Sequence, residues 1–427
     1  MNFGNDAHEK TCIKEAQTNA SRETPAVKPI ILTFTEFYLP GYRGGGPIRT
    51  IANMVEQLSD DFDFHIVTAD RDLHDESPYP HVNVDAWNTV GKAKVFYASP
   101  SVQTLAGIIK LLRETQFDLL YLNSFFDVRF TLRPLLVRRL GLVSSKPIVL
   151  APRGEFSEGA FKLKRWKKAP FVMLARIVSF YRGITWHAST AFEATDICNV
   201  VGVKMNRVGI AADILVAPDL VDVAAMASSN IDEVARVIGP LKVCFLSRIS
   251  PKKNLDFALR VLAKVSRPVE FNIYGPLEEP SYWQMCKDLI AKLPPHIKVS
   301  YGGSIQHELV HATLMVHDLF FLPTHGENFG HVFVEAWSAG LPVLVSDQTP
   351  WRGLEQKRLG WDISLDSLDG FVGALEESAL LDHEQRLYKR KCCLEFAREM
   401  SRSDDALDSN RLLFLIALGR HEAVAAT

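Results

Sequence analysis

The strongest constraint on the fold is an alternation of short apolar runs with segments of helical periodicity, which occurs twice along the chain. In the first half, a β-rich apolar run at residues 29–36 is followed by a glycine-rich loop, a helical segment and a second apolar run. Strands that alternate with helices predict a parallel sheet with helices on both faces. Short apolar runs of this kind predict further strands at residues 64–68, 94–97, 118–123, 147–151, 241–246, 269–274, 297–300, 318–322 and 342–346.

The alternation stops between Pro218 and Pro240 and then starts again. A chain of 427 residues is long enough for two domains of about 100–200 residues each. We therefore expect two α/β domains with a cleft between them, because ligands bind at the carboxyl ends of parallel strands. The expected division is a disordered N-terminal tail, two domains and a last helical stretch, at residues 1–28, 29–225, 226–403 and 404–427.

Composition limits the class of protein and its compartment. Apolar residues make up 47% of the chain and the formal net charge is −2, so no overall field attracts nucleic acid and no nucleic-acid partner is expected. The N-terminus lacks the apolar core of a signal peptide, and no run of about 18 apolar residues exists. We expect a cytoplasmic protein with reduced thiols, because no metal-binding spacing occurs among Cys12, Cys198, Cys244, Cys286, Cys392 and Cys393.

The most informative motif spans residues 326–346 and follows a predicted strand. Glu327 lies in the strand-to-helix loop, and Glu335 lies eight residues later within the helix that begins near Gly330. The free N–H groups of a helix N-terminus suit a diphosphate. Two glutamates in a helical region are by themselves more often surface residues. The spacing of Glu327, Phe329, Gly330 and Glu335, continued by the sequence AGLPV at 339–343, resembles family 4 of the glycosyltransferases, which has the GT-B fold.

This resemblance covers residues from about 29 to 400 and implies two facing Rossmann-like domains with parallel sheets and an interdomain cleft. It implies that Glu335 binds the donor ribose and that Glu327 contacts the donor sugar. Asn328, Phe329 and Gly330 are expected to complete the donor site. It also implies that the last helical stretch crosses back to the first domain.

A second motif, at residues 247–255, directly follows the first strand of the C-terminal half. Arginine offers a forked set of donors and lysine a point charge, so the two residue types can hold a diphosphate. Arg248 and Lys253 match the family's Arg and Lys positions, whereas Ser247 and Asn254 replace its two glycines. Lys252 remains an alternative to Lys253 as the phosphate ligand. A solvated basic loop is the non-functional interpretation.

Two loops of the N-terminal half are expected to face the cleft. Gly45 and Gly46 belong to a glycine-rich loop between a strand and a helix, where glycine lets the backbone approach a ligand closely. Arg153 follows the strand at 147–151 and stands where many family members have histidine. Arginine cannot act as a general base, so it either stabilises the leaving diphosphate, orients the acceptor or caps a loop. His187 is expected to be structural.

The sequence around Arg153, together with residues 186–190 and 346–351, resembles a subgroup that makes bacterial surface polysaccharides. The basic stretch from Lys162 to Lys168 adjoins an apolar segment. It suits an anionic membrane surface, although a solvated helix face followed by a core helix fits equally well. The expected location is the cytoplasm, with peripheral contact at the inner face of the membrane.

The resemblance implies a metal-independent, retaining transfer of a hexose-type sugar from a nucleotide sugar, with UDP as the expected carrier, to a glycan or lipid-linked acceptor. No cofactor and no metal are expected, since the cleft motifs contain no Asp-x-Asp pair suited to a divalent cation. Two alternatives stay open. One is a sugar-nucleotide epimerase of the same architecture, and the other is a degenerate, non-catalytic subunit, for which Arg153 in place of histidine is the best support.

Overall fold

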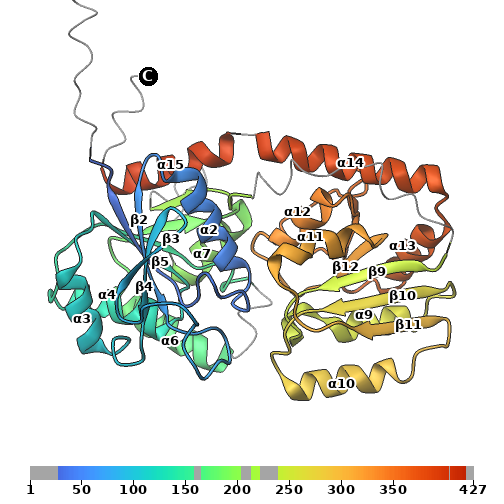
Figure 1. Ribbon diagram of the computed structural model, residues 1–427, viewed down its shortest axis with the longest axis horizontal. Coiled ribbons are helices and arrows are strands. Elements are labelled where there is room, and N and C mark those ends of the chain that lie inside the picture. The colour runs from blue at the N-terminus through green and yellow to red at the C-terminus, as the bar shows by residue number, and fades with distance from the viewer. Residues whose placement is uncertain (1–26, 158–164, 203–212, 222–238, 403, 420–427) are drawn as a thin grey trace, which may run out of the picture.

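The computed structural model describes residues 27–157, 165–202, 213–221, 239–402 and 404–419, which form two α/β domains lying side by side (Figure 1). The predicted tail therefore lies almost entirely outside the described residues. Among the residues described, no helix is long and apolar enough to cross a membrane.

The N-terminal domain is built on an eight-stranded sheet with the order β3-β4-β2-β1-β5-β6-β7-β8. All neighbouring strands pair in parallel except β3, which is antiparallel to β4. The strands are β1 (Ile30–Phe34), β2 (Asp63–Ala69), β3 (Trp87–Val90), β4 (Ala93–Ala98), β5 (Leu119–Asn123), β6 (Ile148–Ala151), β7 (Thr185–Ala188) and β8 (Ile214–Val216). The helices are α2 (Gly46–Leu58), α3 (Leu105–Glu114), the π-helical turn η1 (Val128–Leu132), α4 (Arg133–Arg139), α6 (Arg165–Ile177) and α7 (Ala191–Val201).

The C-terminal domain contains a six-stranded, fully parallel sheet with the order β11-β10-β9-β12-β13-β14. Its strands are β9 (Leu241–Leu246), β10 (Val269–Tyr274), β11 (Ile297–Tyr301), β12 (Leu319–Leu322), β13 (Val343–Ser346) and β14 (Gly360–Ile363). The helices of this half are the 3-10 turn η3 (Pro251–Lys253), α9 (Leu255–Leu262), α10 (Pro280–Ile290), α11 (His307–Met315), α12 (His331–Ser338), α13 (Leu368–Leu380) and α14 (His383–Arg402).

Both sheets reverse their strand order at one point, and these points locate the ligand crevices. In the C-terminal domain the order is third, second, first, fourth, fifth, sixth, which is the doubly wound arrangement. The reversal lies between β9 and β12, and the equivalent reversal of the N-terminal sheet lies between β1 and β5. Ligands bind at the carboxyl ends of the strands that flank such a reversal. Each of the predicted motifs follows one of these four strands or the adjacent β6.

The apolar strands are buried on both faces, as the sequence pattern predicts. In β1, Ile31 belongs to one core cluster of the N-terminal domain, whereas Leu32 and Phe34 belong to the cluster on the opposite face of the sheet. The C-terminal domain has a separate core that includes Phe245, Phe271 and the fully buried Trp337. Each domain therefore buries its own apolar sheet between helices.

The last two helices run along one side of both domains (Figure 1). Helix α14 packs against α12 of the C-terminal domain, whereas α15 (Asp405–Ala417) packs against α2, β6 and β8 of the N-terminal domain. Phe414 of α15 is fully buried against Phe62, Phe64 and Tyr121. The two helices thus tie the end of the chain to the first domain.

Candidate functional site

The loops that carry the sequence motifs meet where the two domains face each other. A Cβ atom added to Gly45 would lie 3.7 Å from Arg248 Nε, and one added to Gly46 would lie 3.9 Å from His331 Cδ2. Gly45 has φ +82° and ψ −150°, a conformation that is open essentially only to glycine. The glycine-rich loop of the first domain therefore faces the cation-bearing loop and helix α12 of the second.

A second close approach joins Gly154, next to Arg153, to Asn328 in the loop before α12. A Cβ atom at Gly154 would lie 2.8 Å from the Asn328 Cβ, and Gly154 has φ +73°. A side chain at this position would both strain the backbone and push the domains apart. Asn328 Nδ2 donates a hydrogen bond to Ser189 Oγ at 2.5 Å, which is a further contact between the domains.

The carboxyl ends of β9 and β12 bring three cations around one carboxylate. Lys253 pairs with Glu327, and both side chains are largely buried. Burial alone would raise the pKa of Glu327, but the nearby charges of Lys253, Lys252 and Arg248 hold it below its ordinary value. Glu327 is therefore ionised at neutral pH, and the cluster carries more positive than negative charge.

Lys252 differs from Lys253 in its surroundings. It makes no ion pair with any described residue, and burial lowers its pKa to about 8, with Lys253 and Arg248 acting in the same direction. Its carbonyl accepts hydrogen bonds from His325 N and Thr324 Oγ1, which fasten this loop to the loop after β12. Arg248 lies 3.2 Å from Glu278, a partner that the sequence did not suggest. Lys252 is thus a buried cation that no described carboxylate pairs with directly, and the charges of Glu327 and Glu155 only partly offset the lowering of its pKa.

Asn254 forms the turn that leads from η3 into α9. Its backbone is left-handed, with φ 63° and ψ 40°, a conformation that asparagine adopts more readily than most residues. Its buried side chain donates a hydrogen bond to the Pro323 carbonyl at 2.9 Å. Asn254 therefore both forms the turn and connects it to the end of β12.

Helix α12 begins directly after Gly330, which has φ +81°, and a Cβ atom there would collide with Phe333 at 2.5 Å. Phe329 is buried against Trp351, and this contact holds the loop before the helix. Glu335 lies in α12 with its carboxylate 3.8 Å from His307 Nδ1. The N-terminus of α12 carries the partial positive charge of the helix and lies in the same loop as Glu327.

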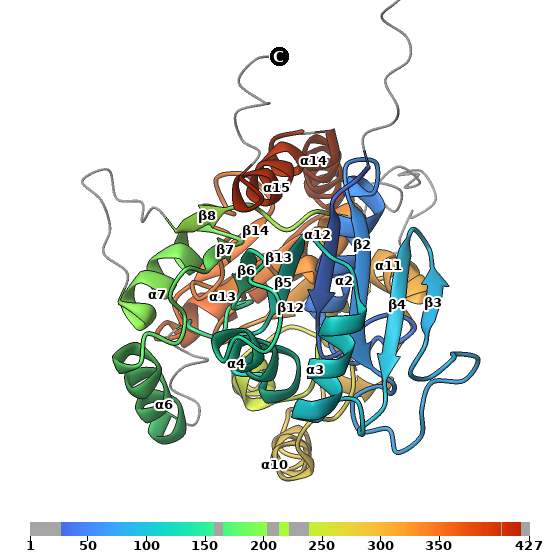
Figure 2. The same cartoon turned by 90° about the vertical axis from the view of Figure 1, so that its left-hand side faces the viewer.

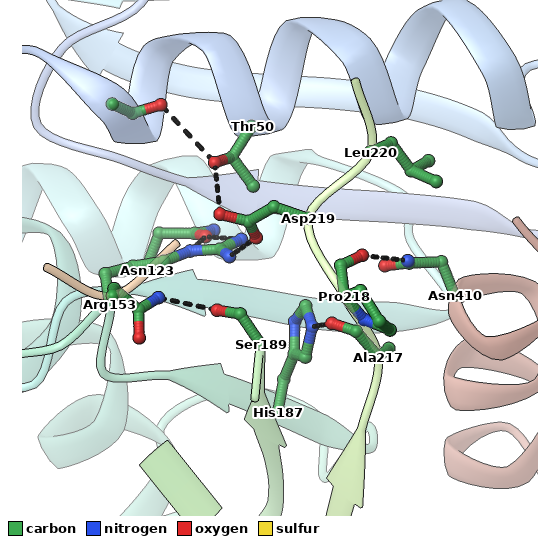
Figure 3. A network of polar contacts seen from close by, with 12 residues as sticks. Thr50, Asn123, Arg153, His187, Ser189, Ala217, Pro218, Asp219, Leu220 and Asn410 are labelled. Carbon is green, nitrogen blue, oxygen red and sulfur yellow. Dashed lines mark hydrogen bonds and ion pairs between the residues drawn. The ribbon is translucent and has the colours of Figure 1, made fainter. Parts of the chain in front are cut away.

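Arg153 lies in a buried polar network near the carboxyl ends of β5 and β6 (Figure 3). Its guanidinium donates to Asp219 Oδ1 at 2.8 Å, to Asn123 Oδ1 and to the Tyr121 hydroxyl, and only 5% of its side chain is exposed. Burial would raise the pKa of Asp219, but Arg153 and then His331 hold it far below its ordinary range. In this arrangement Arg153 holds Asp219 in place.

Asp219 connects that network to the other domain. Thr50 Oγ1 lies 2.9 Å from Asp219 Oδ2 and 2.8 Å from His331 Nε2, and His331 Nε2 is 3.6 Å from the same carboxylate. His331 is the first residue of α12, and Thr50 belongs to α2. The helix that would receive an anion is therefore fixed by a buried carboxylate of the opposite domain.

His187 is fully enclosed, and its two ring nitrogens lie 2.7 Å from the Tyr121 hydroxyl and 2.8 Å from the Ala217 carbonyl. Burial, together with Arg153, lowers its pKa to about 4, so it is neutral at pH 7. Its contacts agree with a structural role.

Asp219, Thr50, His331 and Gly154 were not predicted as site residues. Asp219 lies in the segment interpreted as a seam between the domains, and His331 lies within the motif at 326–346 but is not one of the residues that carry the resemblance. The only sequence signal for Asp219 is its place just after β8, as a polar residue at a strand end.

Of the predicted basic stretch, residues 162–164 lie outside the described part of the chain. Lys168 is described, with its Nζ 5.0 Å from the centre of the Phe126 ring.

Comparison with known proteins shows which class of protein this site and fold resemble. Residues 229–356 match the family described as Glycosyl transferases group 1, so the C-terminal half contains a domain of this type. Two solved structures are similar over nearly the whole chain. HepE from Anabaena, in complex with UDP and glucose, has a TM-score of 0.65 and 16% identity over 93% of this chain and 100% of that one. Sucrose-phosphate synthase from Thermosynechococcus elongatus has a TM-score of 0.65 and 13% identity over 94% and 100%.

The predicted fold class is thereby confirmed: the chain has the GT-B architecture of two facing α/β domains. Among curated proteins it is similar to an uncharacterised 41.2 kDa protein in the cps region of Klebsiella pneumoniae. The two are 24% identical over 306 residues, which cover 71% of this chain and 80% of that protein.

Proposed function

We propose that the chain is a retaining glycosyltransferase of family 4 that moves a hexose-type sugar from a nucleotide sugar to a glycan or lipid-linked acceptor during surface polysaccharide synthesis. One observation carries the proposal: Arg248, Lys252, Lys253 and the N-terminus of α12 surround Glu327 at the strand reversal of the C-terminal sheet. This is a site for an anion beside a carboxylate. The UDP bound in the HepE structure supports UDP as the carrier, and the cps-region relative supports the polysaccharide context.

The donor would bind with its diphosphate between the cation cluster and the first turn of α12. Backbone N–H groups and the helix dipole there would add to the charges of Lys252 and Arg248. Glu335 would accept the ribose hydroxyls, and Glu327 would orient the sugar. Gly45 and Gly46 would lie against the diphosphate from the opposite side, because their backbone faces Arg248 and His331.

We further propose that these protein cations take the place of a metal in stabilising the leaving group. In the transfer step the bond from the anomeric carbon to the phosphate oxygen breaks, and a bond to the acceptor oxygen forms on the same face. The acceptor's proton passes to the departing phosphate oxygen, so no protein nucleophile is required. The protein's contribution is orientation and charge stabilisation. Arg153 would act indirectly, by holding Asp219 and through it His331.

Nucleotide binding gives the most direct test. The thermal unfolding of the protein is measured without metal in the presence of nucleoside diphosphates and their sugars. A ligand at about 100 times its Kd should stabilise the protein by about 2.7 kcal/mol, and we expect UDP and one UDP-sugar to do so. Glu335→Ala should abolish most of the shift, whereas Glu377→Ala, a change of the same type at an exposed position of α13, should not.

No shift with any nucleotide would contradict the transferase proposal and favour a non-catalytic subunit. Release of UDP without an acceptor, together with an epimerised sugar, would instead identify an epimerase. The configuration of the transferred sugar at its anomeric carbon, followed by NMR, tests retention separately.

The pH dependence of nucleotide affinity should report on Lys252. Because its pKa is lowered to about 8, this lysine is charged at pH 7 and loses its charge as the pH rises through 8. UDP affinity should therefore fall by up to about tenfold per pH unit above 8. Titration calorimetry at pH 6 to 9.5 would detect the fall, which Lys252→Met should remove. Lys264→Met, at an exposed ion pair, should retain it. An unchanged pH profile in Lys252→Met would show that another group titrates.

A further inference from the structure

Helix α6 carries an apolar stripe that faces solvent. Trp166, Met173, Leu174, Ile177 and the adjoining Val178 are between 59% and 74% exposed. Their spacing of seven and four residues from Trp166 to Met173 to Ile177 places these side chains along one face of a helix. Isolated exposed apolar residues are ordinary on protein surfaces, but a contiguous stripe on one helix marks an interaction surface.

The helix is fixed to the domain by its other face, so the exposed stripe is not the result of a poorly packed helix. Val172 and Ala175 are buried in the core cluster of the N-terminal sheet, and Phe171 packs against Phe125 and Phe126. The end of α6 is held by Arg139 of α4, which donates hydrogen bonds to the carbonyls at 179, 180 and 182. The stripe is therefore presented on a rigid element.

The surroundings of the stripe are positively charged. Between residues 165 and 192, the described segment that contains α6, the sequence has five lysines and arginines and no acidic residue. Arg138 and Arg139 of α4 have carbonyl oxygens as hydrogen-bond acceptors, and no described carboxylate forms an ion pair with either of them or with Arg182. Burial lowers the pKa of Arg138, and the neighbouring Arg139 charge acts in the same direction.

From this combination we infer that α6 docks the protein on an anionic lipid bilayer, with Trp166, Met173, Leu174 and Ile177 inserted between headgroups. An interfacial helix combines an apolar face with flanking cations in this way, and cations near a negatively charged surface add to the attraction. A partner protein would need acidic groups around an apolar groove, whereas an anionic bilayer supplies both features without further assumptions. The surface lies at the end of the N-terminal domain away from α14 and α15 (Figures 1 and 2).

The inference goes beyond the proposed function and does not depend on it, because lipid binding requires no nucleotide. The full chain is sedimented with vesicles of phosphatidylcholine alone and of phosphatidylcholine mixed with phosphatidylglycerol. We expect binding only to the mixed vesicles, and a decrease as salt is raised from 50 to 500 mM, since surface charges are screened.

The double variant Leu174→Glu/Ile177→Glu should weaken vesicle binding by at least about tenfold, because it places carboxylates in the inserted stripe. Both side chains are exposed, so unfolding is not expected, and circular dichroism with thermal unfolding of the same sample checks that the protein is folded. The matched control is Leu309→Glu/Leu380→Glu, with the same change at exposed positions of the C-terminal domain, and it should bind as the wild type does.

Equal binding of the two double variants to mixed vesicles would overturn the inference. It would also be overturned if the wild type bound neutral and anionic vesicles equally and its binding did not change with salt. Wild-type dimers that become monomers in Leu174→Glu/Ile177→Glu, with no vesicle binding by either form, would also overturn it. That result would identify the stripe as a contact between copies of the chain.

Discussion

Lys253→Ala should reduce turnover by about 100- to 1,000-fold, which is the usual effect of removing one preorganised charge from a site where negative charge develops. Lys253 pairs with the buried Glu327, so its loss both removes a cation and leaves a carboxylate without its closest partner. UDP affinity should fall as well, because the net charge of the cluster becomes less positive. Turnover is measured as UDP released from the nucleotide sugar that gives the largest thermal shift.

Glu327→Gln distinguishes the two partners of this ion pair. It should reduce turnover to a similar extent, because the carboxylate no longer orients the sugar, but UDP affinity should be unchanged or higher. Arg248, Lys252 and Lys253 would then face the diphosphate without the Glu327 carboxylate, and UDP itself lacks the donor hexose that Glu327 would contact. Lys264→Ala, at an exposed ion pair with Asp369, provides the control for the lysine change. Near-normal turnover in both Lys253→Ala and Glu327→Gln would rule out this cluster as the site of transfer.

The parts of the fold that sequence could predict are those in which burial fixes the pattern. Strands such as β1, β5 and β9 are enclosed on both faces, so their sequences are continuous apolar runs. Their bounds agree with the predicted ones to within about two residues. The strands that were not predicted are different. β3 alternates exposed and half-buried residues at the sheet edge, and β8 has only three residues. The four-residue strands β7 and β14 contain His187 and Asp362, which interrupt the apolar run. Without a buried apolar run, such strands have no signal that separates them from loops.

The donor side of the candidate site could be outlined from sequence because its residues lie in two compact motifs at strand ends. The contact between the domains could not. Asp219 is 66 residues from Arg153, and Thr50 is 281 residues from His331, so no local pattern connects them. Their proximity follows from how the two sheets face each other. Sequence spacing therefore predicts groups that act within one loop, whereas partners brought together by domain packing require the structure.

Asp219→Asn should destabilise the protein by about 3–5 kcal/mol at pH 7, because it leaves the Arg153 guanidinium buried without its counterion. The pKa of Asp219 is held below its ordinary range, so its contribution is fully present above the pKa of an unfolded aspartate. That contribution would be lost only as the pH falls towards the folded-state value. Urea unfolding at pH 7, followed by tryptophan fluorescence and circular dichroism together, measures the change in the N-terminal domain.

The matched control is Asp61→Asn, which removes a carboxylate from an ion pair of the same residue types, Arg411 with Asp61. This pair is about one third exposed, so its loss should cost no more than about 1 kcal/mol. The double variant Arg153→Met/Asp219→Asn should be more stable than Asp219→Asn alone, since no unpaired charge remains buried. If Asp219→Asn and Asp61→Asn cost the same, the buried pair does not stabilise the domain. His331 would then be fixed by Thr50 and by the packing of α12 alone.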